Sequence, residues 1–563
     1  MKHFKRAAAM LLAVVLSLCL AVTAFADNTD QSTGNLTVTG SGLWVPAADA
    51  TGTGTGKNVT AIRMFTARVT GDATADPAQQ NEFDSYVLED AWKGFFTADS
   101  RFSAVKTAGG ITDNSVTAAN ITKEALSDAA VAYVKSLTND KTTNAGTLAT
   151  FAHDAQKWAR EKANKTTLNT ANLIKTALAN TANDSNDVTK GTATFTGLTA
   201  GYYLVFPEGG STGNGNRGTD AILVNVPRDG KNTAATIKST FPTVDKQVSN
   251  NGNDYQDNTT AQVGNTVTFK LTAKVPDMTD YSTYKFVFHD NLSKGLAYDA
   301  DSVTVTIGGT VVTKGTDYTV NEPTEESKEL TVTFADLKKV TGVMAGQDIV
   351  VTYTAKITKD AVKDNPAKNT VYLEYSNNPG TDETGKSNPD ESKVYTYDIE
   401  IHKFHTEDID ANRLANATFK LTTDANGNEV VKLVNETVVN TYHVQGDGET
   451  GADTVTTDAT GKITIKGLKA GTYYLHETIA PTGYNKLKKP IKIEITVTGE
   501  AYTTPTYKVD EADQNTSNII KVENVKGTML PETGSFGTIG LTILGVAVVL
   551  LGVFAPKKKK ENR

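Results

Sequence analysis

The sequence predicts a mainly β protein built from tandem β-sandwich domains, with helices inserted into the first of them. Three observations support this prediction. From residue 30 to residue 528, short runs of alternating apolar residues are separated by turn residues. Helix-forming residues at helical spacing occupy two segments, 121–138 and 147–164. The chain has 563 residues, which suffices for three or four domains of ordinary size.

Residues 1–26 have the features of a secretory signal. A basic start is followed by an apolar stretch over residues 7–21 and by a small-x-small cleavage site, Ala24-Phe25-Ala26. An uncleaved membrane anchor is the alternative. The single cysteine, Cys19, lies within this segment, so the mature chain is expected to have no disulfide.

Two interruptions divide the rest of the chain. Pro242 precedes a new strand pattern, and residues 377–390 form a polar, turn-rich connector. We therefore expect three domains, at residues 27–240, 241–390 and 391–527.

The C-terminal segment, residues 530–563, begins with the pentapeptide Leu530-Pro531-Glu532-Thr533-Gly534. Residues 536–555 are mostly apolar and long enough to span a bilayer, and a basic tail follows them. The order of pentapeptide, apolar span and basic tail resembles the sorting signal of sortase substrates. A plain tail anchor that carries the pentapeptide by chance is the alternative. The resemblance implies cleavage between Thr533 and Gly534, transfer of the Thr533 carboxyl to an amine, and covalent attachment to peptidoglycan at the cell surface.

The expected mature chain is acidic. The first 26 residues carry a net charge of +3 and residues 534–563 a net charge of +4, so their removal takes the formal charge from −8 to −15. Such a charge argues against nucleic acid or an anionic membrane as a partner.

In the third expected domain, three polar residues continue apolar stripes. Side chains two residues apart on a strand share one face of the sheet. The stripes are Tyr397, Ile399, Ile401 and Lys403; Tyr473, Leu475 and Glu477; and Ile520, Val522 and Asn524.

The second expected domain repeats this arrangement of a lysine, an acid and an asparagine. Its stripes are Val244, Lys246 and Val248; Phe286, Phe288 and Asp290; and Asn369, Val371, Leu373 and Tyr375. The lysine and asparagine are 123 residues apart here and 121 residues apart in the third domain. Asn377 lies on the same predicted face as Asn369 and is an alternative partner.

Burial of such a set predicts a specific reaction. In apolar surroundings the pKa of a lysine falls and the pKa of a carboxyl rises. A neutral amine is a nucleophile, and a protonated acid can polarise an amide and help ammonia leave. The product is an amide between lysine and asparagine that joins the first strand of a domain to its last, formed once per molecule without a cofactor. A buried ion pair with a hydrogen-bonded asparagine is the alternative.

Motifs in the second and third expected domains carry a family resemblance. Residues 414–419, residues 474–484 and Asn524, ahead of the LPETG pentapeptide, resemble a CnaB-type isopeptide domain, which has an Ig-like fold. Residues 245–246, 289–292 and 369–377 are similar to the second, CnaA-type domain of fimbrial major subunits. The resemblance implies the bonds Lys403–Asn524, assisted by Glu477, and Lys246–Asn369, assisted by Asp290.

The first expected domain lacks such a set. Arg63 occupies the position at which the first strand would offer a lysine, and Phe206 occupies the position that matches Glu477. An arginine stays protonated and cannot attack an amide.

Shaft pilins carry a lysine in a Tyr-Pro-Lys motif that accepts the threonine carboxyl of the next subunit. This sequence has no Tyr-Pro-Lys, and its nearest counterpart is Lys238, four residues before Pro242. Alternation with Ile237 predicts an outward side chain for Lys238. Lys231 is a second candidate.

These features predict a structural shaft subunit of a sortase-polymerised surface pilus rather than an enzyme. Its expected partners are pilin-class and housekeeping sortases, identical subunits and peptidoglycan. Minor pilins and host ligands are further partners that the sequence neither requires nor excludes. A monomeric wall-anchored adhesin is the alternative. Residues 51–57 faintly resemble a phosphate-binding loop, but Asn58 replaces the required Ser or Thr. His402 and His405 fall on opposite faces of a strand, so no metal site is expected.

Overall fold

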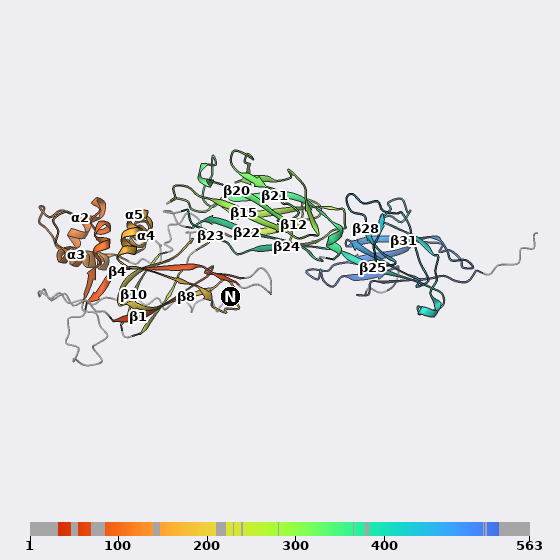
Figure 1. Cartoon of the computed structure of the whole chain (residues 1–563), viewed down its shortest axis with the longest axis horizontal. Coiled ribbons are helices and arrows are strands. Elements are labelled where there is room, and N and C mark those ends of the chain that lie inside the picture. Colours follow the sequence, from red (N-terminus) through yellow and green to blue (C-terminus); the bar gives the residue numbers. More distant parts are fainter. Residues whose placement is uncertain are drawn as a thin grey trace, which may run out of the picture. The chain divides into compact units, whose positions relative to one another are not determined.

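The computed structural model confirms the mainly β class (Figure 1). It describes residues 32–46, 54–68, 85–138, 147–209, 221–228, 230–237, 240–279, 281–363, 365–377, 382–510, 512 and 515–527. Contacts divide the chain into two compact units. One comprises residues 1–261 and 265–395, and the other comprises residues 262–264 and 396–563.

The first sandwich lies in the first unit and consists of two facing sheets. One sheet has the order β11 (Asn232–Thr236), β1 (Thr33–Gly40), β8 (Gly191–Thr199) and β7 (Asn180–Thr181). The other has the order β10 (Ile222–Val226), β9 (Gly201–Pro207), β4 (Asn58–Arg68) and β5 (Ser85–Leu88), with β6 (Ile174–Leu178) also paired to β4. A short ribbon joins β2 (Trp44–Val45) to β3 (Thr55–Gly56).

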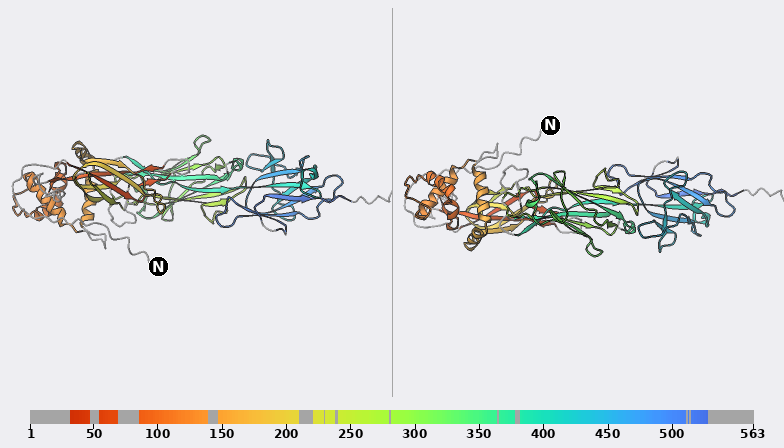
Figure 2. Two further views of the ribbon diagram at one scale, coloured as in Figure 1. Left: turned by 90° about the horizontal axis from the view of Figure 1, so that it is seen from below. Right: turned by 90° about the horizontal axis from the view of Figure 1, so that it is seen from above.

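Strand β4 is buried on both faces. Val59 and Ala61 pack into the core between the two sheets, together with Leu36 and Phe195. Ile62 and Met64 contribute to a second core formed with the helices. The helices therefore cover the outer face of the β4 sheet, and they lie together in both views of Figure 2.

The helical insertion is larger than the sequence predicted. The two predicted segments contain α3 (Lys123–Ser136) and α4 (Thr147–Arg160). A separate helix, α5 (Lys162–Thr170), begins at the end of the second segment and continues beyond it. Thr122 caps α3, because its side chain accepts a hydrogen bond from the backbone N–H of Ala125. Two further helices were missed, α1 (Lys93–Phe96) and α2 (Asp99–Ala108).

The second sandwich also belongs to the first unit. One sheet has the order β12 (Val244–Ser249), β14 (Thr266–Lys274), β21 (Asp348–Ile357), β17 (Thr304–Ile307) and β18 (Thr310–Val311), with β16 (Leu296–Tyr298) paired to β21. The facing sheet has the order β13 (Asn258–Thr260), β24 (Asp390–Tyr395), β22 (Ala367–Ser376), β15 (Phe286–Leu292), β20 (Glu329–Phe334) and β19 (Thr319–Asn321), with β23 (Thr384–Lys386) paired to β22.

The third sandwich forms the second unit. One sheet has the order β27 (Leu433–Asn435), β28 (Thr441–Val444), β30 (Lys462–Leu468), β25 (Tyr397–Phe404) and β34 (Ile519–Glu523). The facing sheet has the order β29 (Val455–Thr456), β26 (Thr418–Thr422), β31 (Gly471–Ile479), β32 (Ile491–Thr496) and β33 (Thr506–Val509).

Several predicted features lie outside the described residues. These are the signal sequence, the candidate acceptor Lys238, and the sorting signal with Leu530, Pro531, Thr533 and Gly534. The apolar stretch at residues 536–555 lies outside them as well. Within the described part of the chain, no helix is both long and apolar enough to cross a membrane.

Candidate functional site

The second sandwich encloses its lysine, acid and asparagine completely. Lys246 on β12 is 0% exposed, Asp290 on β15 is 1% exposed, and Asn369 on β22 is 0% exposed. In each strand the apolar neighbours two residues away are buried as well, which is the register that alternation predicted. A lysine and a carboxylate in such surroundings must pair or become neutral.

The lysine and the acid are in direct contact. Lys246 Nζ donates to Asp290 Oδ1 at 2.7 Å and to Oδ2 at 2.8 Å. The amine also lies 4.9 Å from the centre of the Phe269 ring. Asn369 Oδ1 is buried without a hydrogen-bond partner. An amide carbonyl left without a donor is open to polarisation by a protonated acid.

Burial shifts both ionisable groups toward their neutral forms. Desolvation lowers the pKa of Lys246, opposed by the nearby Asp290 charge. Desolvation also raises the pKa of Asp290, opposed by Lys246. A neutral amine beside a neutral carboxylic acid is the state that amide formation requires.

A bond between Lys246 and Asn369 would join the two sheets of the second sandwich. Strand β12 belongs to one sheet and β22 to the other. Strands β23 and β24 follow β22 in the chain, so β22 is not the last strand. The expectation that each bond joins a first strand to a last strand is therefore wrong for this sandwich.

The third sandwich arranges its set differently. Lys403 Nζ lies 3.6 Å from Glu477 Oε1 and donates to the backbone oxygen of Val522 at 3.1 Å. Asn524 Nδ2 donates to Glu477 Oε2 at 3.0 Å. Lys403 is 0% exposed, Glu477 is 5% exposed and Asn524 is 2% exposed. One carboxylate therefore faces both the amine and the amide.

Here the lysine lies on β25 and the asparagine directly follows the adjacent strand β34 of the same sheet. Strand β25 pairs in parallel with β34, and Lys403 is the register partner of Val522. Asn524 follows two residues later on the same face, as alternation predicted. These are the first and last strands of this sandwich, as expected. Burial lowers the pKa of Lys403 to about 8, opposed by Glu477. Roughly a tenth of the amine is then neutral at pH 7, far more than for an ordinary lysine.

The first sandwich holds an arginine–carboxylate pair instead. Arg63 Nε lies 2.8 Å from Glu89 Oε1, and Thr66 also donates to this oxygen. Phe206 is buried and contacts the Arg160 guanidinium, whose carbon lies 4.7 Å from the ring centre. The sequence analysis did not identify Glu89 as the partner of Arg63, because it lies on a loop outside any stripe.

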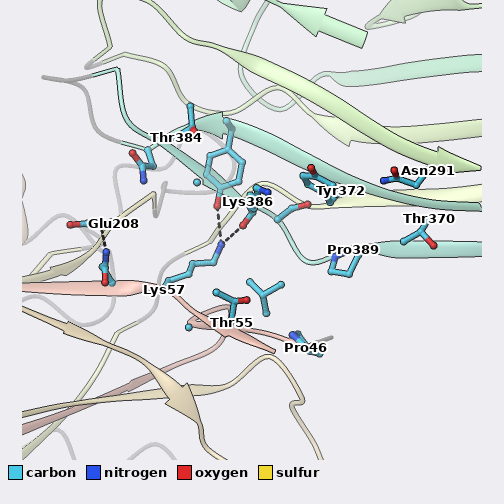
Figure 3. A pocket seen from close by; sticks show the side chains of 17 residues that line it. Pro46, Thr55, Lys57, Glu208, Asn291, Thr370, Tyr372, Thr384, Lys386 and Pro389 are labelled. Atoms are coloured by element: carbon cyan, nitrogen blue, oxygen red, sulfur yellow. Dashed lines mark hydrogen bonds between the residues drawn. The ribbon is translucent and has the colours of Figure 1, made fainter. Parts of the chain in front are cut away.

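Sequence reasoning also missed the role of Lys57. This lysine is partly buried in the first unit, between its first and second sandwiches. Lys57 Nζ donates to Tyr375 Oη at 2.9 Å and to the backbone oxygen of Lys386 at 2.8 Å, as the dashed lines in Figure 3 show. It also lies 4.4 Å from the centre of the Phe241 ring. Burial lowers the pKa of Lys57 to about 7. Its sequence context indicated only a loop.

Lys57 lines a cavity of about 550 Å³ between the two sandwiches. Asn377 lines the same cavity, and its backbone oxygen accepts a hydrogen bond from Gly209. Asn369, by contrast, lies in the sandwich interior with Lys246 and Asp290, which favours Asn369 over Asn377 as the lysine partner. Within the described residues, no cluster of three or more His, Cys, Asp or Glu side chains could hold a metal.

The second and third sandwiches each bury a lysine, an acid and an asparagine within an Ig-like fold. Three family models match this chain in sequence. Residues 263–379 match the Gram-positive pilin backbone subunit 2 Cna-B-like domain, residues 398–510 match the prealbumin-like fold domain SpaA, and residues 523–562 match the LPXTG cell wall anchor motif. The chain therefore contains a Gram-positive pilin backbone domain and a cell wall anchor motif, and the pilin families that it matches are structural subunits rather than enzymes.

The chain is also similar to individual proteins over part of its length. The type 2 fimbrial subunit of Actinomyces naeslundii is 26% identical over 335 residues, which cover 54% of this chain and 59% of that protein. This chain therefore spans less than two thirds of its curated relative. The 35 kDa C-terminal fragment of the major pilin GBS80 of Streptococcus agalactiae is 26% identical, with a TM-score of 0.39, over 51% of this chain and 100% of the fragment. The full-length major pilin SpaD of Corynebacterium diphtheriae is 21% identical, with a TM-score of 0.42, over 89% of this chain and 99% of SpaD.

Proposed function

We propose that this chain is the repeating shaft subunit of a covalently polymerised pilus on the surface of a Gram-positive cell. The observation that carries the proposal is the combination, in one chain, of a pilin backbone domain with an LPXTG wall anchor motif. The proposal keeps the predicted division into domains at residues 27–240, 241–390 and 391–527, with the second boundary moved to residue 395 because β24 pairs with β22 of the second sandwich.

Each of the second and third sandwiches forms one internal amide bond after folding. The neutral amine of Lys246 or Lys403 attacks the side-chain carbonyl of its asparagine, and the acid beside it supplies the proton with which ammonia leaves. The support for these bonds is the complete burial of both sets and the short contacts within them. The bonds Lys246–Asn369 and Lys403–Asn524 are thus maturation steps without turnover or cofactor.

Subunits are joined through the Thr533 carboxyl to a lysine of the next subunit. A pilin-class sortase makes this bond, and a housekeeping sortase transfers the finished polymer to peptidoglycan. The favoured acceptor is Lys238, and Lys231, which is exposed, is the second candidate. With Lys238 as acceptor, tension along the fibre runs through residues 241–533 and leaves the first sandwich outside the loaded segment.

The experiment that tests shaft function is a polymer assay in cells that carry the cognate sortase. Wild-type protein is expected to give a ladder of high-mass, detergent-resistant species. Lys238→Ala is expected to abolish the ladder while the monomer remains anchored, and Lys231→Ala should leave it intact. A wild-type protein that stays monomeric with its sortase would instead identify a wall-anchored adhesin, for a host or microbial ligand.

A further inference from the structure

The hydroxyl of Tyr353 lies between the acid and the amide of the second sandwich. Tyr353 is on β21 and is 1% exposed. Its hydroxyl donates to Asp290 Oδ2 at 2.7 Å and accepts a hydrogen bond from Asn369 Nδ2. Among the described side chains, no direct hydrogen bond joins Asp290 to Asn369. Within the described residues, the hydrogen bonds that connect the amide nitrogen to the acid run through this phenol, from Asn369 to Tyr353 to Asp290. Both bonds reverse when Asp290 is protonated and the attacked nitrogen becomes basic.

The third sandwich provides the contrast. There Glu477 Oε2 accepts the hydrogen bond of Asn524 Nδ2 directly, at 3.0 Å. The longer glutamate side chain reaches the amide itself, whereas the shorter Asp290 is engaged by Lys246 through both oxygens. The second sandwich therefore needs an additional group to carry a proton to the nitrogen that leaves.

We propose that Tyr353 is a catalytic residue of the second sandwich and relays a proton between Asp290 and the leaving nitrogen of Asn369. The inference rests on the proposed Lys246–Asn369 bond and assigns the path by which it forms. A phenol suits this role, because its oxygen can accept one proton while its O–H donates another.

The proposed step conserves atoms and charge. The Lys246 lone pair attacks Asn369 Cγ, so a carbon–nitrogen bond forms while the bond from Cγ to Nδ2 breaks. Tyr353 gives its hydroxyl proton to Nδ2, which leaves as ammonia, and takes the proton of the Asp290 carboxyl. The proton that Lys246 Nζ releases restores Asp290, so one amide bond and one ammonia are the only products.

Packing holds the phenol in place for this exchange. The Tyr353 ring stacks on Phe269 of the neighbouring β14, with ring centres 5.3 Å apart. The Tyr298 ring contacts it from another side, at 5.9 Å. Burial and the Asp290 charge raise the pKa of Tyr353 well above its ordinary value, so the hydroxyl keeps its proton until the amide accepts one.

The test is Tyr353→Phe in the full ectodomain, which keeps the stacked ring and removes only the hydroxyl. Freshly synthesised protein is sampled over time and digested, and the peptide pairs that contain each lysine are quantified by mass. Loss of a general acid typically slows such a step about 100-fold or more. We expect the Lys246–Asn369 link to form that much more slowly, and the Lys403–Asn524 link to form at the wild-type rate. Tyr298→Phe, whose hydroxyl bonds to Glu322, is the matched control and should behave as wild type.

A wild-type rate for Lys246–Asn369 in Tyr353→Phe overturns the relay. A second measurement covers the case in which Tyr353→Phe folds poorly. A ring-fluorinated, more acidic tyrosine at position 353 should shift the pH dependence of the rate at which the Lys246–Asn369 link forms. An unshifted pH profile also overturns the relay. Failure of the underlying Lys246–Asn369 bond is distinguishable, because wild-type protein would then show no link at Lys246 at any time, whereas failure of shaft function appears only in the polymer assay.

Discussion

Lys246 and Asp290 form a salt bridge of 2.7 Å between side chains that are 0% and 1% exposed. Removing both charges from water is costly, and a buried ion pair is by itself weak evidence for stability. The pair is better explained as the reactant state of a bond-forming site, because an amide and a phenol complete the set. The predictions below follow from this explanation.

Asn524→Ala should lower the free energy of unfolding of the third sandwich. The variant keeps Lys403 and Glu477 together and removes only the group that is attacked. A crosslink that closes a loop of this length is worth roughly 5 kcal/mol by analogy with disulfides. Denaturant unfolding of the ectodomain measures the loss, and Lys432→Ala, an exposed lysine of the same sandwich, should change stability by less than about 1 kcal/mol. Equal stability of Asn524→Ala and wild type would exclude a link at this site.

Glu477→Gln should block or strongly slow the third link and leave the second unaffected. The glutamine can still fill the site, but it cannot deliver a proton to Asn524 Nδ2. Peptide mapping should recover the Lys403 peptide unlinked and the Lys246 peptide linked to Asn369. Asp290→Asn should give the reverse pattern, which makes each variant the control of the other. Loss of both links from either single variant would contradict independent sites.

Arg63→Lys should not create a crosslink in the first sandwich. The new amine would face Glu89, but no asparagine side chain is among the described contacts of Arg63. The intact mass of the variant should show no ammonia loss beyond that of wild type. An additional loss would mean that a single lysine suffices, and it would undermine the requirement for three groups.

Lys57→Met should change how stability depends on pH. The pKa of Lys57 is about 7 in the folded protein, against an ordinary value of 10.5, so the unfolded chain binds more protons between these values. Stability therefore rises with pH above about 7, by at most about 1.4 kcal/mol per pH unit for one proton. All three tryptophans, Trp44, Trp92 and Trp158, lie in the first expected domain, so their fluorescence reports its unfolding.

The comparison of wild type with Lys57→Met between pH 7 and 9 isolates this effect, because the contributions of other groups cancel. Wild type should gain stability relative to the variant as pH rises. Parallel pH profiles would show that Lys57 is not desolvated at this contact.

The sequence was sufficient to predict the buried sets, because strand alternation fixes the face of every residue. Lys246 and Lys403 interrupt apolar stripes, and only a partner group or a reaction explains a lysine there. Helices α3 and α4 were predictable from their spacing, whereas α1 is only four residues long and α2 has too weak an apolar face to be recognised.

The remaining site residues could not be recognised from sequence for physical reasons. Tyr353 alternates with Val351 and Ala355 like any core aromatic, and its role depends on the atoms that the facing sheet brings to its hydroxyl. Lys57 follows a glycine- and threonine-rich loop, and its burial depends on contacts with Tyr375 and Lys386, more than 300 residues away in the chain. Such contacts arise only when separate sheets pack.

The most direct test of self-crosslinking is the intact mass of the purified ectodomain, residues 27–533. Two internal amide bonds release two molecules of ammonia, and the mass should fall below the theoretical value by that amount. The double variant Asn369→Ala and Asn524→Ala should show its full theoretical mass. A wild-type protein that also has its full theoretical mass would contradict both bonds.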